Sequence, residues 1–132
     1  MDIKIKNMNT NILAYIGDGV YELFVREKIV TQECKGINEI NKRVIAYVSS
    51  QGQSMAAKEL QNGFLTEEEK NLLKRARNKR SMSRPKNADP KKYKLATAFE
   101  ALIGALYLEG NYERAETIME KAMQIVEGEI NE

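Results

Sequence analysis

The sequence contains no histidine and a single cysteine, and these absences exclude several kinds of catalytic and metal site. Without histidine, no imidazole can act as a general base or bind a transition metal. One thiol, Cys34, can form neither an internal disulfide nor a Cys-rich zinc site, and a lone cysteine is typical of the reducing cytoplasm, where we expect this protein. Any metal must be held by oxygen ligands, which favours Mg²⁺ with Mn²⁺ as a substitute.

Long apolar runs and alternating patterns are also missing. No stretch approaches the roughly 20 apolar residues that a membrane-spanning helix requires. The N-terminus lacks the apolar segment of a signal peptide, so we expect no membrane association. No segment alternates with period two, so no strand is predicted. The chain of 132 residues is 42% hydrophobic and 30% charged, and we expect residues 1–132 to form one all-α domain, a bundle of six or seven helices.

Helical periodicity, caps and glycines predict where the helices begin and end. We expect residues 1–8 to be a loose lead-in and helices to cover about 12–29, 38–50, 54–61, 67–80, 90–108 and 111–127. The core-facing stripe of the first helix is expected to be Ile12, Ile16, Val20, Leu23 and Phe24, and that of the second to be Ile40, Val44, Ile45 and Val48. Thr66 and Glu69 have the spacing of a capping box.

Two isolated acids stand out because each lies in an otherwise uncharged helical segment. The stretch from Leu95 to Leu108 is apolar nearly all round, and its one charge is Glu100; Asp18 is the only charge between Asn11 and Tyr21. An ionised carboxylate in apolar surroundings costs several kcal/mol unless it has a partner or a proton. If the two helices pack side by side, Asp18 and Glu100 can share one divalent metal. The alternative is that each acid is a capped or salt-bridged core residue.

The residues around Asp18 allow two interpretations. Gly17 and Gly19 flank it, and each lowers helix stability by roughly 1 kcal/mol relative to alanine. Either two helices cross tightly at this point, or a ligand approaches the backbone beside Asp18. Glu22 follows one turn later on the same face and is a candidate for an additional carboxylate near the site; the alternative is a simple pair with Arg26.

Charge is segregated along the chain although the net charge is only +2. Ten basic residues and one acid, Asp89, lie between Leu72 and Lys94, which makes this segment +9 and leaves −7 for the rest. Such segregation predicts a polyanionic partner that one local surface contacts. Two carboxylates beside a basic segment suit metal-assisted phosphodiester hydrolysis, because a hard cation polarises a phosphoryl oxygen and generates a water nucleophile.

Two segments of the chain resemble the ribonuclease III family. Residues 15–20, Tyr-Ile-Gly-Asp-Gly-Val, resemble the signature helix of that family, and residues 99–108, Phe-Glu-Ala-Leu-Ile-Gly-Ala-Leu-Tyr-Leu, resemble its second catalytic segment. Each motif is moderately specific; in this order and about 80 residues apart they are highly specific. The short length and residues 74–78 and 85–87 are similar to the short bacterial branch, Mini-ribonuclease III.

The resemblance implies a ribonuclease III endonuclease-domain fold and a Mg²⁺-dependent endoribonuclease that cleaves double-stranded RNA. By position, it makes Asp18 and Glu100 the catalytic, metal-binding residues and leaves the role of Glu22 open. It also implies maturation of 23S ribosomal RNA precursor ends, with a ribosomal protein as a helper. Ala14 and Thr97 stand where longer members carry a glutamate and an aspartate, so the number of metal ions and direct ligands stays open.

The resemblance further implies how the chain holds RNA and how it assembles. We expect no separate double-stranded-RNA-binding domain, so RNA affinity is assigned to the basic segment. The predicted RNA-binding residues are Lys74, Arg75, Arg77, Asn78, Lys79, Arg80, Ser81, Arg84, Lys86 and Asn87; the alternative is a solvated helix end followed by a loop. The family is a symmetric homodimer with one cutting centre per subunit, and Leu13, Tyr21 and Val25 are the expected self-complementary patch.

Two other functions fit parts of this pattern. The first is a non-catalytic RNA-binding or ribosome-assembly module with the same fold; the retention of Asp18 and Glu100 argues against it, because an unused buried acid is costly. The second is a helical interaction domain whose basic segment binds an acidic protein. Salt-dependent RNA binding would distinguish the second from a nuclease.

Overall fold

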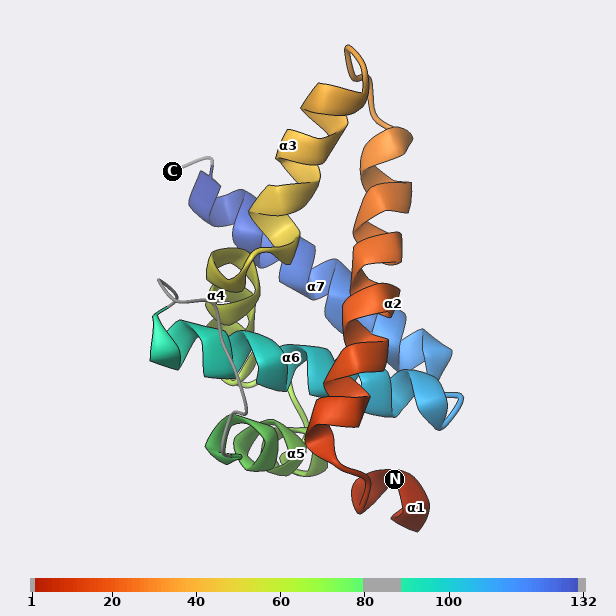
Figure 1. The fold of residues 1–132 in the computed structure, drawn as a ribbon, viewed down its shortest axis with the longest axis vertical. Helices are drawn as coiled ribbons and strands as arrows, with labels where there is room; N and C mark the ends of the chain where they lie inside the picture. Colours follow the sequence, from red (N-terminus) through yellow and green to blue (C-terminus); the bar gives the residue numbers. More distant parts are fainter. Residues whose placement is uncertain (1, 80–88, 131–132) are drawn as a thin grey trace.

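The computed structural model describes residues 2–79 and 89–130, and within these ranges the protein has seven helices and no strand (Figure 1). The helices are α1 (Ile3–Lys6), α2 (Thr10–Val30), α3 (Ile37–Val48), α4 (Ser50–Leu60), α5 (Glu67–Asn78), α6 (Pro90–Leu108) and α7 (Tyr112–Ile130). The prediction of an all-α protein with six or seven helices is confirmed. No helix in the described ranges is both long enough and apolar enough to cross a bilayer.

Local sequence signals explain several helix ends. Thr66 and Glu69 form the predicted capping box of α5, with reciprocal hydrogen bonds of 2.9 and 3.1 Å. The Asp89 carboxylate accepts a hydrogen bond from the Lys91 amide at 2.9 Å, and α6 begins with a proline, whose missing N–H is not needed there. The expected loose lead-in is wrong in one detail, because residues 3–6 form a short helix capped by Asp2.

Helix α6 is the centre of the fold. It contacts α2, α4, α5 and α7, and Figure 1 shows it crossing the middle of the molecule with α2 lying across it. Its buried residues are Ala96, Ala98, Phe99, Ala101, Leu102, Ile103, Gly104, Ala105 and Leu106. The prediction that this helix is buried is confirmed. A helix with apolar residues on every face is stable in water only when other helices cover those faces.

The predicted orientation of α2 is wrong in part: Val20 and Phe24 are partly buried and pack against the core, but they lie at the edge of the buried stripe. The buried stripe is Leu13, Ala14, Gly17, Tyr21, Val25 and Ile29, whereas Ile12 and Leu23, which were expected in the core, are 54% and 59% exposed. Ile45 of α3, also expected to face inward, is 60% exposed. Since Leu13, Tyr21 and Val25 are completely buried, the self-complementary surface patch proposed for them cannot exist in this fold.

The orientation of α2 follows from its crossing with α6. A Cβ atom on Gly17 would overlap the carbonyl oxygen of Glu100, and a Cβ on Gly104 would overlap the carbonyl oxygen of Leu13. The two backbones therefore touch, and only glycine at both positions permits the approach. One turn further along α2, Tyr21 packs edge-on against Phe99 with ring centroids 4.9 Å apart.

Candidate active site

Asp18 and Glu100 line one pocket, as the sequence predicted. The pocket has a volume of about 400 Å³ and is formed by α2, α6, the end of α3 and the first turn of α4. Its lining residues are Asn11, Ala14, Tyr15, Asp18, Val48, Ser50, Gln53, Tyr93, Ala96, Thr97 and Glu100. Asp18 is exposed at the surface, whereas Glu100 is half-buried. One acid thus faces solvent and the other forms part of the pocket wall.

The helix crossing explains how two acids about 80 residues apart come together. Gly17 lies directly against the backbone of Glu100, and Asp18 is the next residue of α2. The contact fixes the position of Asp18 along α2 relative to Glu100 on α6. Of the two interpretations of Gly17, the tight helix crossing is confirmed. Gly19 has no atom near the position of a Cβ, so packing within this chain does not explain it.

The pocket changes the acidity of Glu100. The pKa of this carboxyl rises from 4.5 to about 9, chiefly because burial disfavours the charged form and then because Asp18 shares a hydrogen bond with it and repels its charge. The charge of Glu22 raises the pKa further, and a hydrogen bond from the Gln53 side chain lowers it. At neutral pH Glu100 therefore retains its proton unless a cation takes the place of that proton.

The donor set fits a hard cation with few protein ligands. Asp18 and Glu100 supply carboxylate oxygens, which Mg²⁺ and Mn²⁺ prefer, and Mg²⁺ commonly keeps several water molecules. Across the ranges 2–79 and 89–130 no group of three or more acidic or cysteine side chains is close enough to hold an ion. The site thus provides two carboxylates and leaves the remaining coordination positions for water and substrate oxygen atoms.

Neighbouring positions do not enlarge this ligand set. Ala14 and Thr97 line the same pocket, and the Thr97 hydroxyl donates to the Tyr93 carbonyl at 2.9 Å. Glu22 forms the predicted pair with Arg26, at 3.3 Å, while its charge still reaches Glu100. Glu22 therefore contributes to the electrostatic potential at the site, while one of its carboxylate oxygens pairs with Arg26.

Part of the predicted RNA-binding segment lies at the surface of α5. Lys74 and Asn78 are exposed, and Arg77 is half-buried with its Nε 3.4 Å from Asn78 Oδ1. Lys79 follows directly after α5 and is half-buried. The remaining predicted residues, Arg80, Ser81, Arg84, Lys86 and Asn87, lie outside the described residues.

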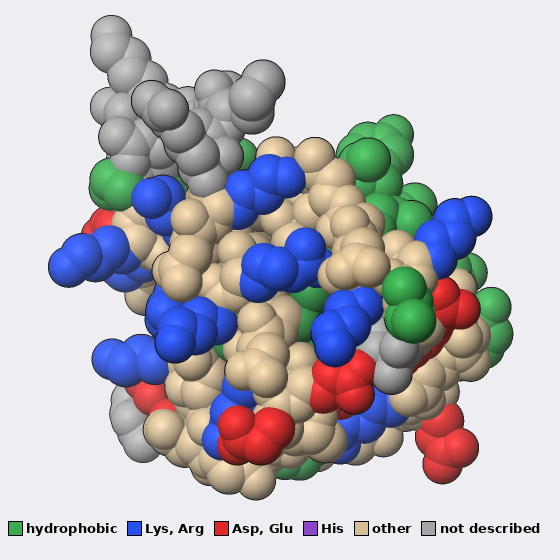
Figure 2. Space-filling model, turned by 90° about the horizontal axis from the view of Figure 1, so that it is seen from below, with side chains coloured by type: hydrophobic (Ala, Val, Ile, Leu, Met, Phe, Trp, Pro, Cys, Tyr) green, Lys and Arg blue, Asp and Glu red, His purple; other side chains and the backbone are tan. Residues whose placement is uncertain are grey.

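Arg75 occupies a different position from its neighbours. Its guanidinium donates hydrogen bonds to the carbonyls of Lys6, at 2.6 Å, and Met8, at 3.4 Å, so it ties the end of α1 to α5. Lys4 and Lys6 of α1, the helix end that Arg75 holds, are exposed. Figure 2 shows many Lys and Arg side chains on the face that carries α1 and α5. Lys4 and Lys6 were not among the predicted RNA-binding residues.

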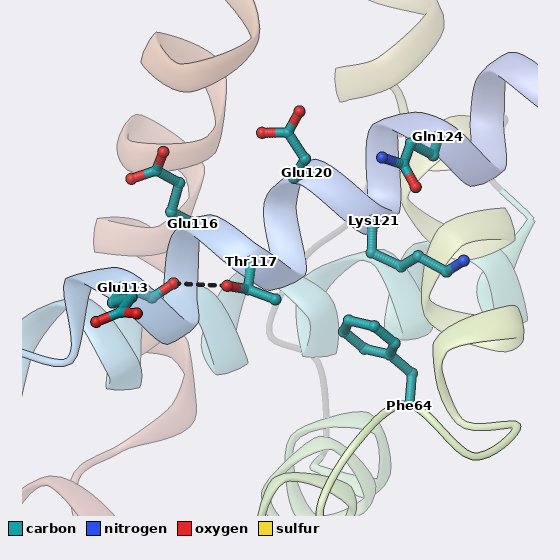
Figure 3. Close-up of a pocket in the computed structure, with 7 residues that line it drawn as sticks. All are labelled: Phe64, Glu113, Glu116, Thr117, Glu120, Lys121 and Gln124. Carbon is teal, nitrogen blue, oxygen red and sulfur yellow. Dashed lines mark hydrogen bonds between the residues drawn. The ribbon is translucent and has the colours of Figure 1, made fainter.

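Two of the other grooves on the described part of the chain can be compared with this pocket. One, of about 410 Å³, runs along α7, and Figure 3 shows its Glu113, Glu116 and Glu120 carboxylates spread along the helix without converging. The other, of about 360 Å³, lies between α2 and α7 and is mainly apolar, with Leu23 and Tyr112 in its wall. Neither groove contains a set of side chains arranged for phosphodiester chemistry.

Comparison with known proteins agrees with this geometry. Residues 11–111 match the family model for the ribonuclease III domain. The chain is 44% identical over 121 residues to Mini-ribonuclease 3 of Brevibacillus brevis, covering 92% of this chain and 90% of that one. It is 41% identical over 116 residues to Mini-ribonuclease 3 of Thermoanaerobacter sp., covering 88% and 81%. A crystal structure of a Fusobacterium nucleatum protein superposes with a TM-score of 0.79 at 34% identity, covering 93% of this chain and 98% of the other.

Proposed function

Because the chain belongs to the ribonuclease III family, we propose that it is a divalent-metal-dependent endoribonuclease that cleaves double-stranded RNA in the bacterial cytoplasm. The observation that carries the proposal is the convergence of Asp18 and Glu100 in one pocket at the α2–α6 crossing. The family assignment alone supports a ribonuclease. The pocket supports the dependence on Mg²⁺ or Mn²⁺, since two carboxylates this close need a cation or a shared proton.

The proposed mechanism assigns separate tasks to the residues of the site. Asp18 and Glu100 would hold the metal. When bound, the metal would stabilise negative charge at the phosphate and lower the pKa of a water molecule, which could then lose a proton and act as the nucleophile. To hold the cation, the Glu100 carboxyl would have to release its proton to solvent. Asp18 is exposed, so its carboxylate is open to a substrate that approaches from solvent. With no histidine in the chain, no imidazole is available, and we assign proton transfer to the carboxylates and water.

RNA binding is assigned to the basic surface of α1, α5 and the start of α6. Lys74 and Asn78 are exposed on α5, and Lys91 and Lys94 are exposed on the first turns of α6. Because A-form RNA is recognised mainly by its shape and backbone, exposed ammonium and amide groups are the expected donors. The proposed substrate is a duplex at the ends of precursor 23S ribosomal RNA, with a ribosomal protein as helper. The resemblance of the sequence motifs implies both, and the names of the relatives support a ribonuclease.

We assign dimerisation to the exposed apolar side of α2, in place of the buried residues of that helix. Ile12 is 54% exposed and Leu23 is 59% exposed, and the apolar groove beside Leu23 continues to Tyr107 and Tyr112. Large apolar side chains gathered on one helix side are typical of a surface that another protein covers. A second copy placed there would give two cutting centres, one for each strand of a duplex.

The direct test is to incubate the purified protein with a long RNA duplex, with Mg²⁺ and with a chelator. We expect cleavage only with the metal. Asp18→Asn and Glu100→Gln are expected to abolish cleavage while leaving the affinity for RNA nearly unchanged. RNA binding without cleavage by the wild type would instead favour a non-catalytic RNA-binding or ribosome-assembly module. Cleavage at the wild-type rate by either variant would show that the altered residue is not catalytic.

A further inference from the structure

Gln53 is a buried polar side chain in the wall of the Asp18–Glu100 pocket. It lies in the first turn of α4 and is 2% exposed. Among the described residues the buried polar or charged side chains are Thr10, Gln53, Ser54 and Glu69, and only Gln53 lines this pocket. A buried amide is costly unless its donors and its acceptor have partners. A leucine or methionine would fill the same space without that cost, so the amide requires its own explanation.

Two contacts account for the amide donors. Nε2 donates a hydrogen bond to the Val48 carbonyl at 3.0 Å, which anchors the side chain to the end of α3. The amide also makes a hydrogen bond to the Glu100 side chain. An NH₂ group has two protons, so one can remain on the backbone while the other holds a carboxylate oxygen. One Nε2 proton thereby anchors the amide to α3, and the other is directed at Glu100.

We propose that Gln53 is a positioning residue, which holds the Glu100 carboxylate in the orientation that binds the divalent metal together with Asp18. The inference depends on the proposed function, because it assumes that Glu100, which Gln53 contacts, binds a metal. Groups that hydrogen-bond to metal ligands orient them, and their loss typically weakens metal affinity or activity by 10- to 100-fold.

The chemistry of an amide suits this position. A glutamate at position 53 would bring a third negative charge to a pair of acids that already repel each other. A lysine or arginine would occupy the place of the cation. The glutamine amide carries no charge at any pH and donates to the carboxylate without competing for the metal. Its bond to the Val48 carbonyl also keeps the donor in place when RNA or metal is absent.

The experiment compares Gln53→Met with Gln61→Met. Gln61 is a matched control because its Nε2 likewise donates to a backbone carbonyl, that of Ala57 at 3.2 Å, and it follows directly after the same helix. Mn²⁺ affinity is measured by titration calorimetry without RNA. We expect Gln53→Met to bind Mn²⁺ at least about 10-fold more weakly than the wild type. We expect the affinity of Gln61→Met to match the wild type.

Cleavage kinetics give a second readout. The Mg²⁺ concentration for half-maximal cleavage should rise in Gln53→Met by about the same factor as the loss of Mn²⁺ affinity, while KM for RNA stays constant. Should Gln53→Met fail to fold, Gln53→Asn replaces it: it keeps an amide but is one methylene too short to bridge Val48 and Glu100, so it should also lose Mn²⁺ affinity.

The outcomes separate the two proposals. Wild-type Mn²⁺ affinity in a folded Gln53 variant overturns the positioning role and leaves the nuclease assignment intact. An equal loss in Gln61→Met also overturns it, because the effect would then be a general weakening of α4. A wild-type protein that neither binds Mn²⁺ nor cuts RNA overturns the proposed function and this inference with it.

Discussion

Gly17 of α2 and Gly104 of α6 form a reciprocal contact in which each lies against the backbone of the other helix. A Cβ on Gly17 would be 2.9 Å from the Gly104 amide nitrogen, and a Cβ on Gly104 would be 3.0 Å from the Gly17 amide nitrogen. The helices approach until their main chains touch. This contact determines which side of α2 is buried and places Asp18 beside Glu100, so one packing feature produces both the core and the candidate active site.

The first prediction concerns the crossing itself. Gly17→Ala puts a methyl group into the Glu100 carbonyl, a rigid backbone atom, so the helices must separate. We expect the free energy of unfolding to fall by at least about 2 kcal/mol. Gly19→Ala is the control: nothing lies near its Cβ, and the better helix propensity of alanine should add up to about 1 kcal/mol. Urea denaturation of both variants checks this, and a Gly17→Ala protein as stable as the wild type would contradict the tight crossing.

The second prediction concerns the buried ion pair between α5 and α7. Glu69 accepts hydrogen bonds from Arg114 at 2.7 and 2.8 Å and is 5% exposed. Burial raises the pKa of Glu69, but the hydrogen bonds from Arg114 and Thr66 outweigh it, and the net pKa lies below 4.5. Stability from this pair is therefore present above pH 4.5 and lost as pH falls through the folded-state pKa. Glu69→Gln should lower the free energy of unfolding by about 3 kcal/mol at pH 7. The variant should also lose less stability than the wild type as the pH falls.

Glu67→Gln is the matched control for Glu69. Glu67 lies in the same helical turn, but its side chain is 86% exposed and its contact with Lys70 is 3.6 Å long. An exposed pair of this kind contributes at most about 1 kcal/mol. Thermal unfolding between pH 3 and 7 should separate the two variants. Equal destabilisation of both would show that the Glu69–Arg114 pair adds nothing beyond a surface charge.

The third prediction uses the pKa of Glu100. In the metal-free protein this pKa is about 9, above the ordinary 4.5, so between these values the folded state holds a proton that the unfolded state has lost. The free energy of unfolding should therefore fall as pH rises through that window, by up to about 1.4 kcal/mol per pH unit. Glu100→Gln should remove this slope and be more stable than the wild type at pH 8. Identical pH profiles in chelator would contradict the burial of the acid beside Asp18.

The amino-acid sequence was sufficient to predict the helices and the two acids, but it was not sufficient to orient α2. Helix ends are encoded locally, as at Thr66 and Asp89, so caps could be identified from a few residues. The orientation of α2 depends on a partner helix. Its sequence has two apolar stripes, and the buried stripe passes through Gly17, where a missing side chain rather than an apolar one makes the contact. A search for large apolar residues therefore selected the other stripe.

The candidate site shows the same limit. Asp18 and Glu100 were identifiable because a lone charge in an apolar segment can be recognised from the sequence alone. Gln53 carried no such signal, since glutamines are common on helix surfaces and only the folded structure buries this one. Arg75 was conversely indistinguishable from the other basic residues of α5 until its donors were found on the carbonyls of α1.

The fourth prediction separates Lys74 from Arg75, adjacent basic residues on α5. Lys74 is exposed and makes no hydrogen bond or ion pair within the described part of the chain, whereas Arg75 binds the carbonyls of Lys6 and Met8. We expect Lys74→Ala to weaken RNA binding and to reduce the salt-dependence slope by somewhat less than one for each phosphate that the variant no longer neutralises. Arg75→Ala should mainly lower the melting temperature. Mobility shifts at several salt concentrations, with thermal unfolding, distinguish the two; an unchanged Lys74→Ala slope would locate the RNA surface elsewhere.

The last prediction tests assembly through the exposed side of α2. Leu23 is 59% exposed and lines the apolar groove with Tyr107 and Tyr112. If a second copy covers this groove, Leu23→Glu would bury an unpaired charge in the interface and should shift the protein from dimer to monomer at micromolar concentration. Ile45→Glu is the control, because Ile45 is equally exposed, at 60%, but belongs to α3 and to neither wall of the groove. Light scattering measures the molar mass of each protein in solution. A monomeric wild type would rule out the dimer, and dissociation by Ile45→Glu but not by Leu23→Glu would move the interface to α3.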